Sequence, residues 1–446
     1  MSKWLLERQP ANRRSSCHIA RKADFSPSKV SALEHDDNTR LVMVLSALEP
    51  YLAPLVWKME RERIGRHNRY PVHVMMRSFI AGWVYQIPVK NELIRELRRN
   101  GSLRRLVGIE SINRVPKAWQ FSRFISRLAK EENLALLESA FERCVEKLRE
   151  LLPGLGRNLG IDGTSCKSWS SGMKNEKTSL ASDPDAGWGI REKRKKKDGK
   201  VEKVTKKWFG YLVTLIVDCD HELPVSFDVS PANQSEMTKL PKMFDDLREK
   251  HPDMDIRTVI ADACYDSAEN CGYVLNKLKA LPVIKMRLKD GPDAECTTSI
   301  CRCTELGVPI CDEGSKMRYA GRDGDYLKWR CPAVLDGRAC KCTIDNCSTS
   351  AYGRVLKVRT AEDVRRFPGL SRDSHKWRRL YRKRSACERV NARLKNYLLL
   401  DEQRVRGRGK VTVQVAMSIL VMLASAISMA KLDKLEEVRR IVALAA

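Results

Sequence analysis

The strongest constraint on the fold is the alternation of strand and helix patterns between residues 158 and 286. Segments rich in β-branched and aromatic residues are predicted as strands, and they cover residues 159–162, 208–218, 223–229, 256–262 and 281–286. Apolar residues at helical spacing predict helices over 235–250 and 267–278. Three strands followed by helix, strand, helix and strand predict a mixed sheet with helices on its faces, and so an α/β core.

Two of the predicted buried strands end in a carboxylate. The first strand ends at Asp162, and the strand over 256–262 ends at Asp262. A single Asp at the end of a strand is usually a cap or turn residue. Ligands of open α/β sheets, however, bind in the crevice outside the carboxyl ends of the strands. The pair therefore predicts one crevice that holds both carboxylates.

Helical patterns flank this core. Residues 1–40 are polar and weakly periodic and are predicted to form a flexible basic leader. Residues 41–155 are predicted to form a helical domain that binds DNA, with a generic helical bundle as an equal alternative. The longest apolar run, 411–430, contains Ser, Thr and Gln residues, so it predicts a buried helix rather than a membrane span. Residues 431–446 are predicted to form a C-terminal tail.

The charge of the chain indicates the class of partner. The 446 residues carry 83 Lys and Arg against 56 Asp and Glu, a formal net charge of +27. Such a surplus favours a polyanionic partner, and nucleic acid is the usual one, although a merely soluble basic protein is the alternative. Part of the surplus is local, with +7 over residues 191–207 and +10 over 371–410. No apolar segment follows the charged N-terminus, so no secretory signal is predicted.

The segment 374–398 is predicted as one helix with an apolar face and a polar face. At about 100° per residue, Tyr381, Arg384, Glu388 and Lys395 share an arc of about 60°. A Glu among cations usually makes surface ion pairs of about 0–1 kcal/mol. Here the cations on the same face would hold phosphate oxygens beside the carboxylate, an arrangement that suits a divalent metal between them.

The spacing of these four residues, Y-(2)-R-(3)-E-(6)-K, resembles the signature of bacterial insertion-sequence transposases of the DDE type. Other segments of the chain resemble segments of proteins of that family. They correspond to the two segments that carry the family's aspartates, to a stretch between these two, and to the helical domain that precedes them. They are Ile161–Thr164, Val259–Ser267, Leu223–Val225 with Pro231–Asn233, and Glu96–Leu97 with Arg123–Phe124. The resemblance covers about residues 40–430.

The resemblance implies a fold. We expect an RNase H-like mixed-sheet catalytic core built from residues 156–287 and 374–430, with the N-terminal helical domain before it. The residues between the two parts of the core, 288–373, form a cysteine-rich insertion in this expectation.

The resemblance also implies a chemistry. Asp162, Asp262 and Glu388 are expected to be catalytic and to bind Mg²⁺ or Mn²⁺, with Asp162 bridging two ions. Water would cleave DNA at the ends of the element, and the freed 3′-OH would attack target DNA. Tyr381 would contact a DNA phosphate, and the Arg and Lys of the signature, Arg384 and Lys395, would also bind DNA.

The expected partners are the terminal inverted repeats of the element and the target DNA. Joining two ends predicts a homodimer or a larger assembly on DNA, in the cytoplasm at the nucleoid and away from the membrane. A DNA-binding regulator or an inactive transposase-derived protein is the main alternative, and it would bind DNA without Mg²⁺. A nuclease would cleave without joining. A tyrosine recombinase would use Tyr381 as its nucleophile but would not need the two aspartates.

Eight of the fifteen cysteines lie in the predicted insertion, with gaps that form nearly a mirror image. Thiolates brought together by a folded-back chain suit one or two tetrahedral Zn²⁺ sites. Because none of the gaps is the usual Cys-x₂-Cys, a metal-free insertion is an equal alternative. The eight candidate zinc ligands are Cys296, Cys301, Cys303, Cys311, Cys331, Cys340, Cys342 and Cys347.

Overall fold

The computed structural model describes residues 39–63, 70–173, 181–197, 200–299, 301–338, 347–348, 350–402 and 404–440, with only the backbone of residues 192–203. Most of the leader predicted over 1–40 lies outside these residues, and its last two, Thr39 and Arg40, begin the first helix.

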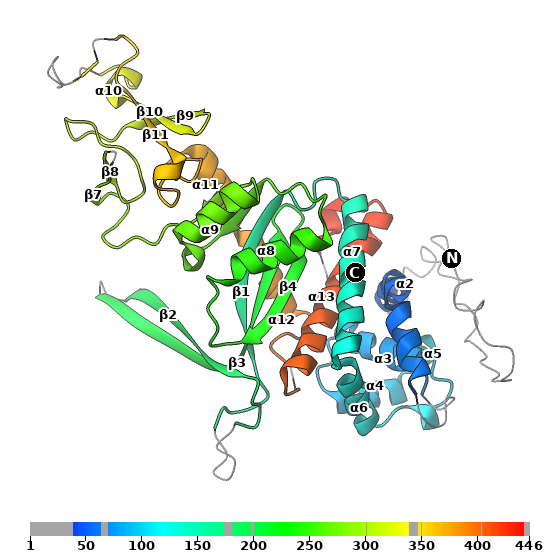
Figure 1. Ribbon diagram of the computed structural model, residues 1–446. Helices are drawn as coiled ribbons and strands as arrows, with labels where there is room; N and C mark the ends of the chain where they lie inside the picture. Colours follow the sequence, from blue (N-terminus) through cyan, green and yellow to red (C-terminus); the bar gives the residue numbers. More distant parts are fainter. Residues whose placement is uncertain are drawn as a thin grey trace.

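The N-terminal part of the chain is helical, as predicted. Its helices are α2 (Thr39–Arg61), α3 (Val72–Val84), α4 (Lys90–Arg99), α5 (Gly101–Leu106), α6 (Ala118–Leu128) and α7 (Glu131–Leu151), with a 3₁₀ turn η2 (Ile112–Arg114). Apolar side chains at spacings of three and four line their inner faces. Helix α7 lies against the sheet, where Phe141 packs edge-on to Phe227 with ring centroids 5.2 Å apart (Figure 1).

The core is a mixed six-stranded sheet, which confirms the predicted α/β core. The strand order is β2-β3-β1-β5-β6, and β4 also pairs with β3. Strand β1 is antiparallel to β3 and parallel to β5. The strands are β1 (Asn158–Lys167), β2 (Gly187–Lys197), β3 (Lys200–Asp218), β4 (Leu223–Pro231), β5 (Thr258–Ala261) and β6 (Leu281–Ile284). The connecting helices are α8 (Lys239–Lys250), η3 (Ala263–Tyr265), α9 (Ala268–Gly272) and the π-helical turn η4 (Tyr273–Lys277).

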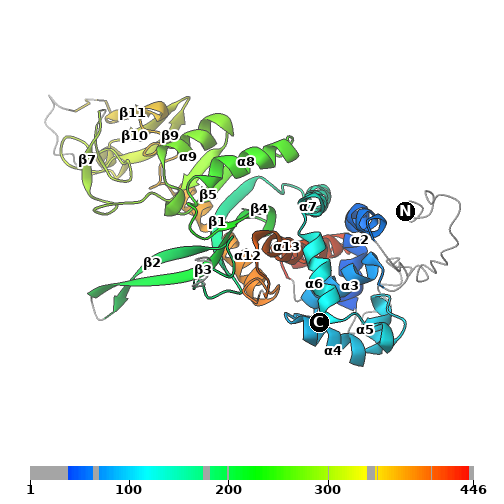
Figure 2. The ribbon, with the colours of Figure 1, turned by 60° about the horizontal axis from the view of Figure 1, so that its bottom comes forward.

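One strand of this sheet was not predicted. Strand β2 and the first half of β3 form a long hairpin that projects from the core in both ribbon views (Figures 1 and 2). Its register runs from Gly187 opposite Gly210 to Lys197 opposite Lys200. The Lys- and Arg-rich sequence lacks the alternation of apolar and polar residues that marks a strand. Backbone pairing to β3 makes it a strand instead.

The segment predicted as one helix over 374–398 is two helices, α11 (His375–Arg382) and α12 (Ser385–Asn396). At the junction, the backbone N–H groups of Arg384, Ala386 and Cys387 donate to carbonyls three residues back rather than four. This tighter turn interrupts the even spacing on which the single-helix prediction depends.

The last long helix, α13 (Arg408–Lys431), confirms the buried helix predicted over 411–430. It contacts α7, α2, α3, α6 and β4, and so lies between the helical part and the sheet. Helices α2 and α13 are both long and apolar enough to cross a membrane, but 89% of the most apolar window of α13 is buried inside the protein. A short turn, η7 (Leu435–Glu437), follows it.

The predicted cysteine-rich insertion contains short strands and projects from the top left of Figure 1. Its elements are β7 (Glu295–Thr297), β8 (Arg302–Thr304), β9 (Arg318–Asp323), β10 (Tyr326–Arg330), α10 (Pro332–Leu335), β11 (Val355–Arg359) and η6 (Thr360–Glu362). A separate small core holds the three-stranded sheet β11-β10-β9, and it consists of Met317, Leu327, Trp329, Val358 and Phe367.

Candidate active site

The parallel pairing of β1 and β5 places Asp162 beside Asp262. Ile161 pairs with Ala261 at the end of β5, so the next residue of each strand lies at the same edge of the sheet. The side chain of Asp162 is 16% exposed. Asp262 caps the turn η3, where its Oδ1 accepts a hydrogen bond from the N–H of Cys264 at 2.8 Å. The prediction that the first strand ends at Asp162 is wrong, because β1 continues to Lys167, paired with β3. It is the shorter strand β5 that ends here, so the two aspartates lie side by side just beyond the end of β5.

Helix α12 packs directly on β1 beneath this edge. A Cβ at Gly160 would lie 2.5 Å from the Sγ of Cys387 and 2.8 Å from that of Cys219, so only glycine permits this approach. One turn after Glu388, the Nδ2 of Asn391 donates to Asp162 Oδ2 at 2.9 Å. This hydrogen bond fixes the position of α12 relative to the first aspartate.

Glu388 and Asp162 share the guanidinium of Arg384. Arg384 Nη2 hydrogen-bonds Glu388 Oε1, and its Nη1 lies 4.0 Å from Asp162 Oδ1. No group of three or more His, Cys, Asp or Glu among the described residues is arranged to hold a metal ion. Even so, a positive charge already lies between two carboxylates here, and all the predicted ligands are carboxylate oxygens. Both features fit a hard divalent cation such as Mg²⁺.

The surroundings of Asp162 shift the pKa of its carboxyl group upward. Burial, together with the negative charge of Asp262, raises the pKa of Asp162 to about 7 against the opposing effect of Arg384. A desolvated pair of carboxylates favours the uptake of a proton or a cation.

The other residues of the signature lie at different distances from this pair. Tyr381 is half-buried and stacks on Trp377, with ring centroids 4.8 Å apart. Lys395 Nζ donates to the carbonyl of Ser165 at 2.9 Å, and Ser165 lies three residues beyond Asp162, a distance of about 10 Å along a strand. The structure therefore brings Arg384 to the carboxylates and places Lys395 farther along β1.

Three other carboxylates near these strands are occupied by structural contacts. Asp218 accepts hydrogen bonds from the backbone N–H of Gly156, Asp220 and His221. Asp220 pairs with Lys383, and Asp266 binds Arg365 at 2.7 Å and the N–H of Arg287. Their oxygens hold turns and loops together, so they are weaker candidates than Asp162 and Asp262.

Three of the predicted zinc ligands, Cys296, Cys301 and Cys303, come close together in the described residues. The Sγ atoms of Cys296 and Cys303 lie 3.5 Å apart across the β7–β8 hairpin. A hydrogen bond with Cys303 lowers the pKa of the Cys301 thiol to about 7. Cys340 and Cys342 lie outside the described residues. The zinc prediction therefore stays a prediction.

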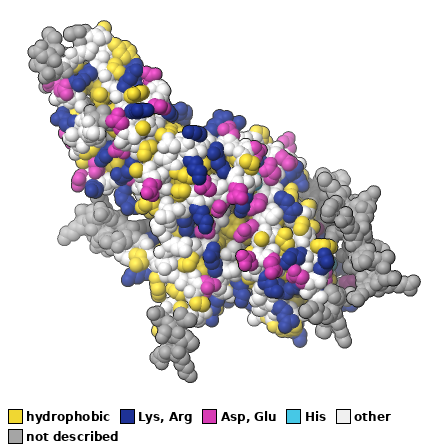
Figure 3. Space-filling model, viewed as in Figure 1, with side chains coloured by type: hydrophobic (Ala, Val, Ile, Leu, Met, Phe, Trp, Pro, Cys, Tyr) yellow, Lys and Arg dark blue, Asp and Glu magenta, His cyan; other side chains and the backbone are white. Residues whose placement is uncertain are grey.

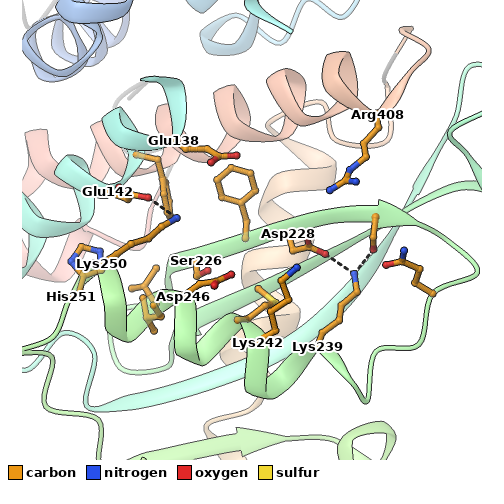
Figure 4. A pocket seen from close by; sticks show the side chains of 17 residues that line it. Glu138, Glu142, Ser226, Asp228, Lys239, Lys242, Asp246, Lys250, His251 and Arg408 are labelled. Carbon is orange, nitrogen blue, oxygen red and sulfur yellow. Dashed lines mark hydrogen bonds and ion pairs between the residues drawn. The ribbon is translucent and has the colours of Figure 1, made fainter. Parts of the chain in front are cut away.

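A charged cavity beside the sheet is separate from this site. It has a volume of about 330 Å³ and lies between α7, α8 and β4 (Figure 4). Its charges pair with one another, as Lys239 does with Asp228 and Lys250 with Glu142, each at 2.6 Å. On the face drawn in Figure 3, Asp and Glu side chains are interspersed with Lys and Arg side chains.

Sequence reasoning missed three residues of the site, Asn391, Arg191 and Glu236. Arg191 Nη2 donates to Glu236 Oε1 at 3.0 Å and to the carbonyl of Gly163 at 2.7 Å, directly after Asp162. Arg191 belongs to the unpredicted hairpin, and Glu236 lies in the turn before α8, although the helix was predicted to begin at residue 235. The one feature of the sequence that indicates Asn391 is its position one helical turn after Glu388.

Comparisons with known proteins find two family models and a solved structure. The family model described as Transposase DDE domain matches residues 161–424, and Transposase domain (DUF772) matches 32–127. A solved structure, the piggyBac transposase synaptic complex with hairpin DNA, aligns over 95% of this chain and 86% of its own, at 11% identity and a TM-score of 0.28. A search of the curated proteins gives no significant match.

The match to the DDE domain covers more than half of the chain and spans both parts of the core. It confirms the predicted RNase H-like fold of the mixed sheet, while the four-residue signature itself stays a prediction. The chain belongs to the DDE transposases of insertion sequences.

Proposed function

We propose that this transposase cleaves DNA at the ends of its own insertion sequence and joins the 3′-OH ends to target DNA, with Asp162, Asp262 and Glu388 as its metal-binding catalytic residues. The observation that carries the proposal is the parallel register of β1 and β5, which puts Asp162 beside Asp262. The bond from Asn391 to Asp162 supports the placement of the Glu388 helix at the same edge.

Each step exchanges one phosphodiester bond for another bond to phosphorus. In the first, the oxygen of a water attacks phosphorus at the element end, the bond to the 3′-oxygen breaks, and this oxygen takes a proton as a 3′-OH. In the second, the 3′-OH attacks phosphorus in target DNA and displaces the target 3′-oxygen. A divalent cation, when bound, would activate the nucleophile and stabilise the leaving oxygen.

The residues of the chain would orient the DNA for these steps. Arg384 already contacts both Glu388 and Asp162, and its second function would be to hold a phosphate oxygen of the scissile strand. Lys395 would hold the backbone about three residues along β1. The β2–β3 hairpin, with its net charge of +7 over 191–207, would follow the duplex outside the crevice. Because two ends must be joined, we propose a dimer or larger assembly on DNA at the nucleoid.

The test uses the full chain with a DNA fragment that carries its own element end. With Mg²⁺, we expect a nick at the end that leaves a 3′-OH, and joined products when target DNA is added. Glu388→Gln should abolish both reactions and leave DNA binding in EDTA unchanged. Glu249→Gln is the matched control, because Glu249 is exposed on α8 away from the site.

The outcomes separate the alternatives. Nicking by Glu388→Gln at the parent rate would remove Glu388 from the mechanism. Specific binding without cleavage by the parent protein would indicate the regulator or an inactive copy. Nicking without joined products would indicate a nuclease.

A further inference from the structure

A fourth carboxylate reaches the edge of the sheet that carries the aspartate pair. Glu236 lies in the turn between β4 and α8, and its side chain is only 17% exposed. Its carboxylate lies against Gly163, where a Cβ would be 2.7 Å from both Cδ and Oε2 of Glu236. Because no larger side chain fits, the glycine after Asp162 makes the space that Glu236 fills.

Arg191 holds the carboxylate in this place. Its Nη2 donates both to Glu236 Oε1 and to the carbonyl of Gly163, at 3.0 and 2.7 Å. The pairing of β5 with β1 ends at Ala261 opposite Ile161, so the backbone of Gly163 has no β5 partner. Arg191 therefore lies in the space beyond the end of β5, where its Nη2 links the carbonyl of Gly163 to the carboxylate of Glu236.

The buried hydroxyl of Tyr265 interacts electrostatically with the same carboxylates. Tyr265 is fully buried, and its OH has no hydrogen-bond partner among the residues that the structure describes. Burial and then the charges of Glu236, Asp162 and Asp262 raise the pKa of Tyr265, so the hydroxyl lies within the field of all three carboxylates. A buried hydroxyl without a partner costs about 1–3 kcal/mol. A hydrated cation held by the three carboxylates would supply the partner that it lacks.

We propose that Glu236 is a fourth carboxylate of the divalent-cation site, supplied by the turn before α8 and held ready by Arg191 and Gly163. This inference rests on the proposed function. Hard cations bind through oxygen atoms and keep several waters, so Glu236, held against the residue after Asp162, would reach the ion through one of these waters. Without the cation, the ion pair with Arg191 balances the charge of Glu236. With the cation bound, the Tyr265 hydroxyl donates a hydrogen bond to the carboxylates and waters around the ion.

The test measures cation binding and does not depend on turnover. Full-length protein without DNA is titrated with Mn²⁺, and free Mn²⁺ is followed by electron paramagnetic resonance. We expect Glu236→Gln to weaken Mn²⁺ binding about ten-fold, the loss typical of a residue that supports a metal ligand. The matched control, Glu249→Gln, should bind Mn²⁺ as the parent does. Equal affinities for the two variants would overturn the proposal.

Asp162→Asn separates this inference from the proposed function. If Asp162→Asn loses Mn²⁺ binding and Glu236→Gln does not, only the fourth carboxylate is wrong. If Asp162→Asn keeps full affinity, the triad itself is wrong. Should Glu236→Gln fail to fold by circular dichroism in EDTA, Glu236→Asp is measured instead, because its carboxylate is drawn back by one methylene. Parent-like affinity in that variant would also overturn the proposal.

Discussion

Single residues decide how closely the elements of the site approach one another. Gly160 brings the sulfur atoms of Cys387 and Cys219 to the backbone of β1, and Gly163 does the same for Glu236. Neither glycine has a φ that requires glycine. Each is needed for space, a property that depends on what the fold brings to it and that cannot be deduced from the sequence around it.

Gly160→Ala should destabilise the protein by about 1–3 kcal/mol, because the added methyl group overpacks the contact between β1 and α12. The measurement is the free energy of unfolding in urea. Gly272→Ala is the control, since a Cβ there would meet its nearest atom only at 3.9 Å and inside a helix. A loss no larger than that of the control would contradict the close packing.

The raised pKa of Asp162 predicts a pH dependence of stability in EDTA. The folded state favours the protonated carboxyl, because burial and the charge of Asp262 raise its pKa to about 7 from 3.8. This contribution is complete below about pH 4 and is lost as the pH rises through 7. The free energy of unfolding of Asp162→Asn, minus that of the parent, should therefore be larger at pH 8 than at pH 5. A difference that does not change with pH would exclude the raised pKa.

At the scale of elements, the sequence predicts best where one face of a strand or helix is apolar. The strands at 208–218 and 223–229 and the helix at 235–250 follow such patterns and are found close to their predicted places. Strand β2 has apolar side chains only near its start and was missed, because most of its length is held to β3 by backbone pairing. The break between α11 and α12 was also missed, since both sides keep a helical pattern.

The cysteine-rich insertion carries a prediction at this scale. Two thiolates on one tetrahedral Zn²⁺ lie about 3.8 Å apart, given Zn–S bonds of about 2.3 Å, and the Sγ atoms of Cys296 and Cys303 lie 3.5 Å apart. We predict at least one zinc per purified chain by elemental analysis. Cys303→Ser should lower that content, whereas Cys144→Ser, in the helix α7, should not. Less than one zinc per chain, with no change in Cys303→Ser, would indicate a metal-free insertion.

At the scale of the whole molecule, α13 joins the helical part to the sheet. One continuous hydrophobic cluster contains buried residues of α2, α3, α7, α13 and the strands. Leu420 on α13 is fully buried. Leu420→Ala should cost about 2–5 kcal/mol through the cavity that it leaves.

Because α13 contacts both parts, Leu420→Ala should lower their melting temperatures together, as seen by circular dichroism of helices and by Trp fluorescence. Leu435→Ala, at a residue that is 48% exposed, should cost less than about 1 kcal/mol. Two separate transitions in the Leu420→Ala variant would contradict a shared core.

The sequence by itself determined the α/β class, because the strands and helices of the core each follow a local period that one face of an element must satisfy. It also marked Asp162 and Asp262, although only Asp262 directly follows the end of its strand. The tertiary structure alone decided that β1 and β5 are parallel neighbours in a register that joins Asp162 to Asp262. It also brought Asn391, Arg191 and Glu236 to the same edge from three separate elements. Contacts of this kind are set by the packing of distant segments, which leaves no period in the chain.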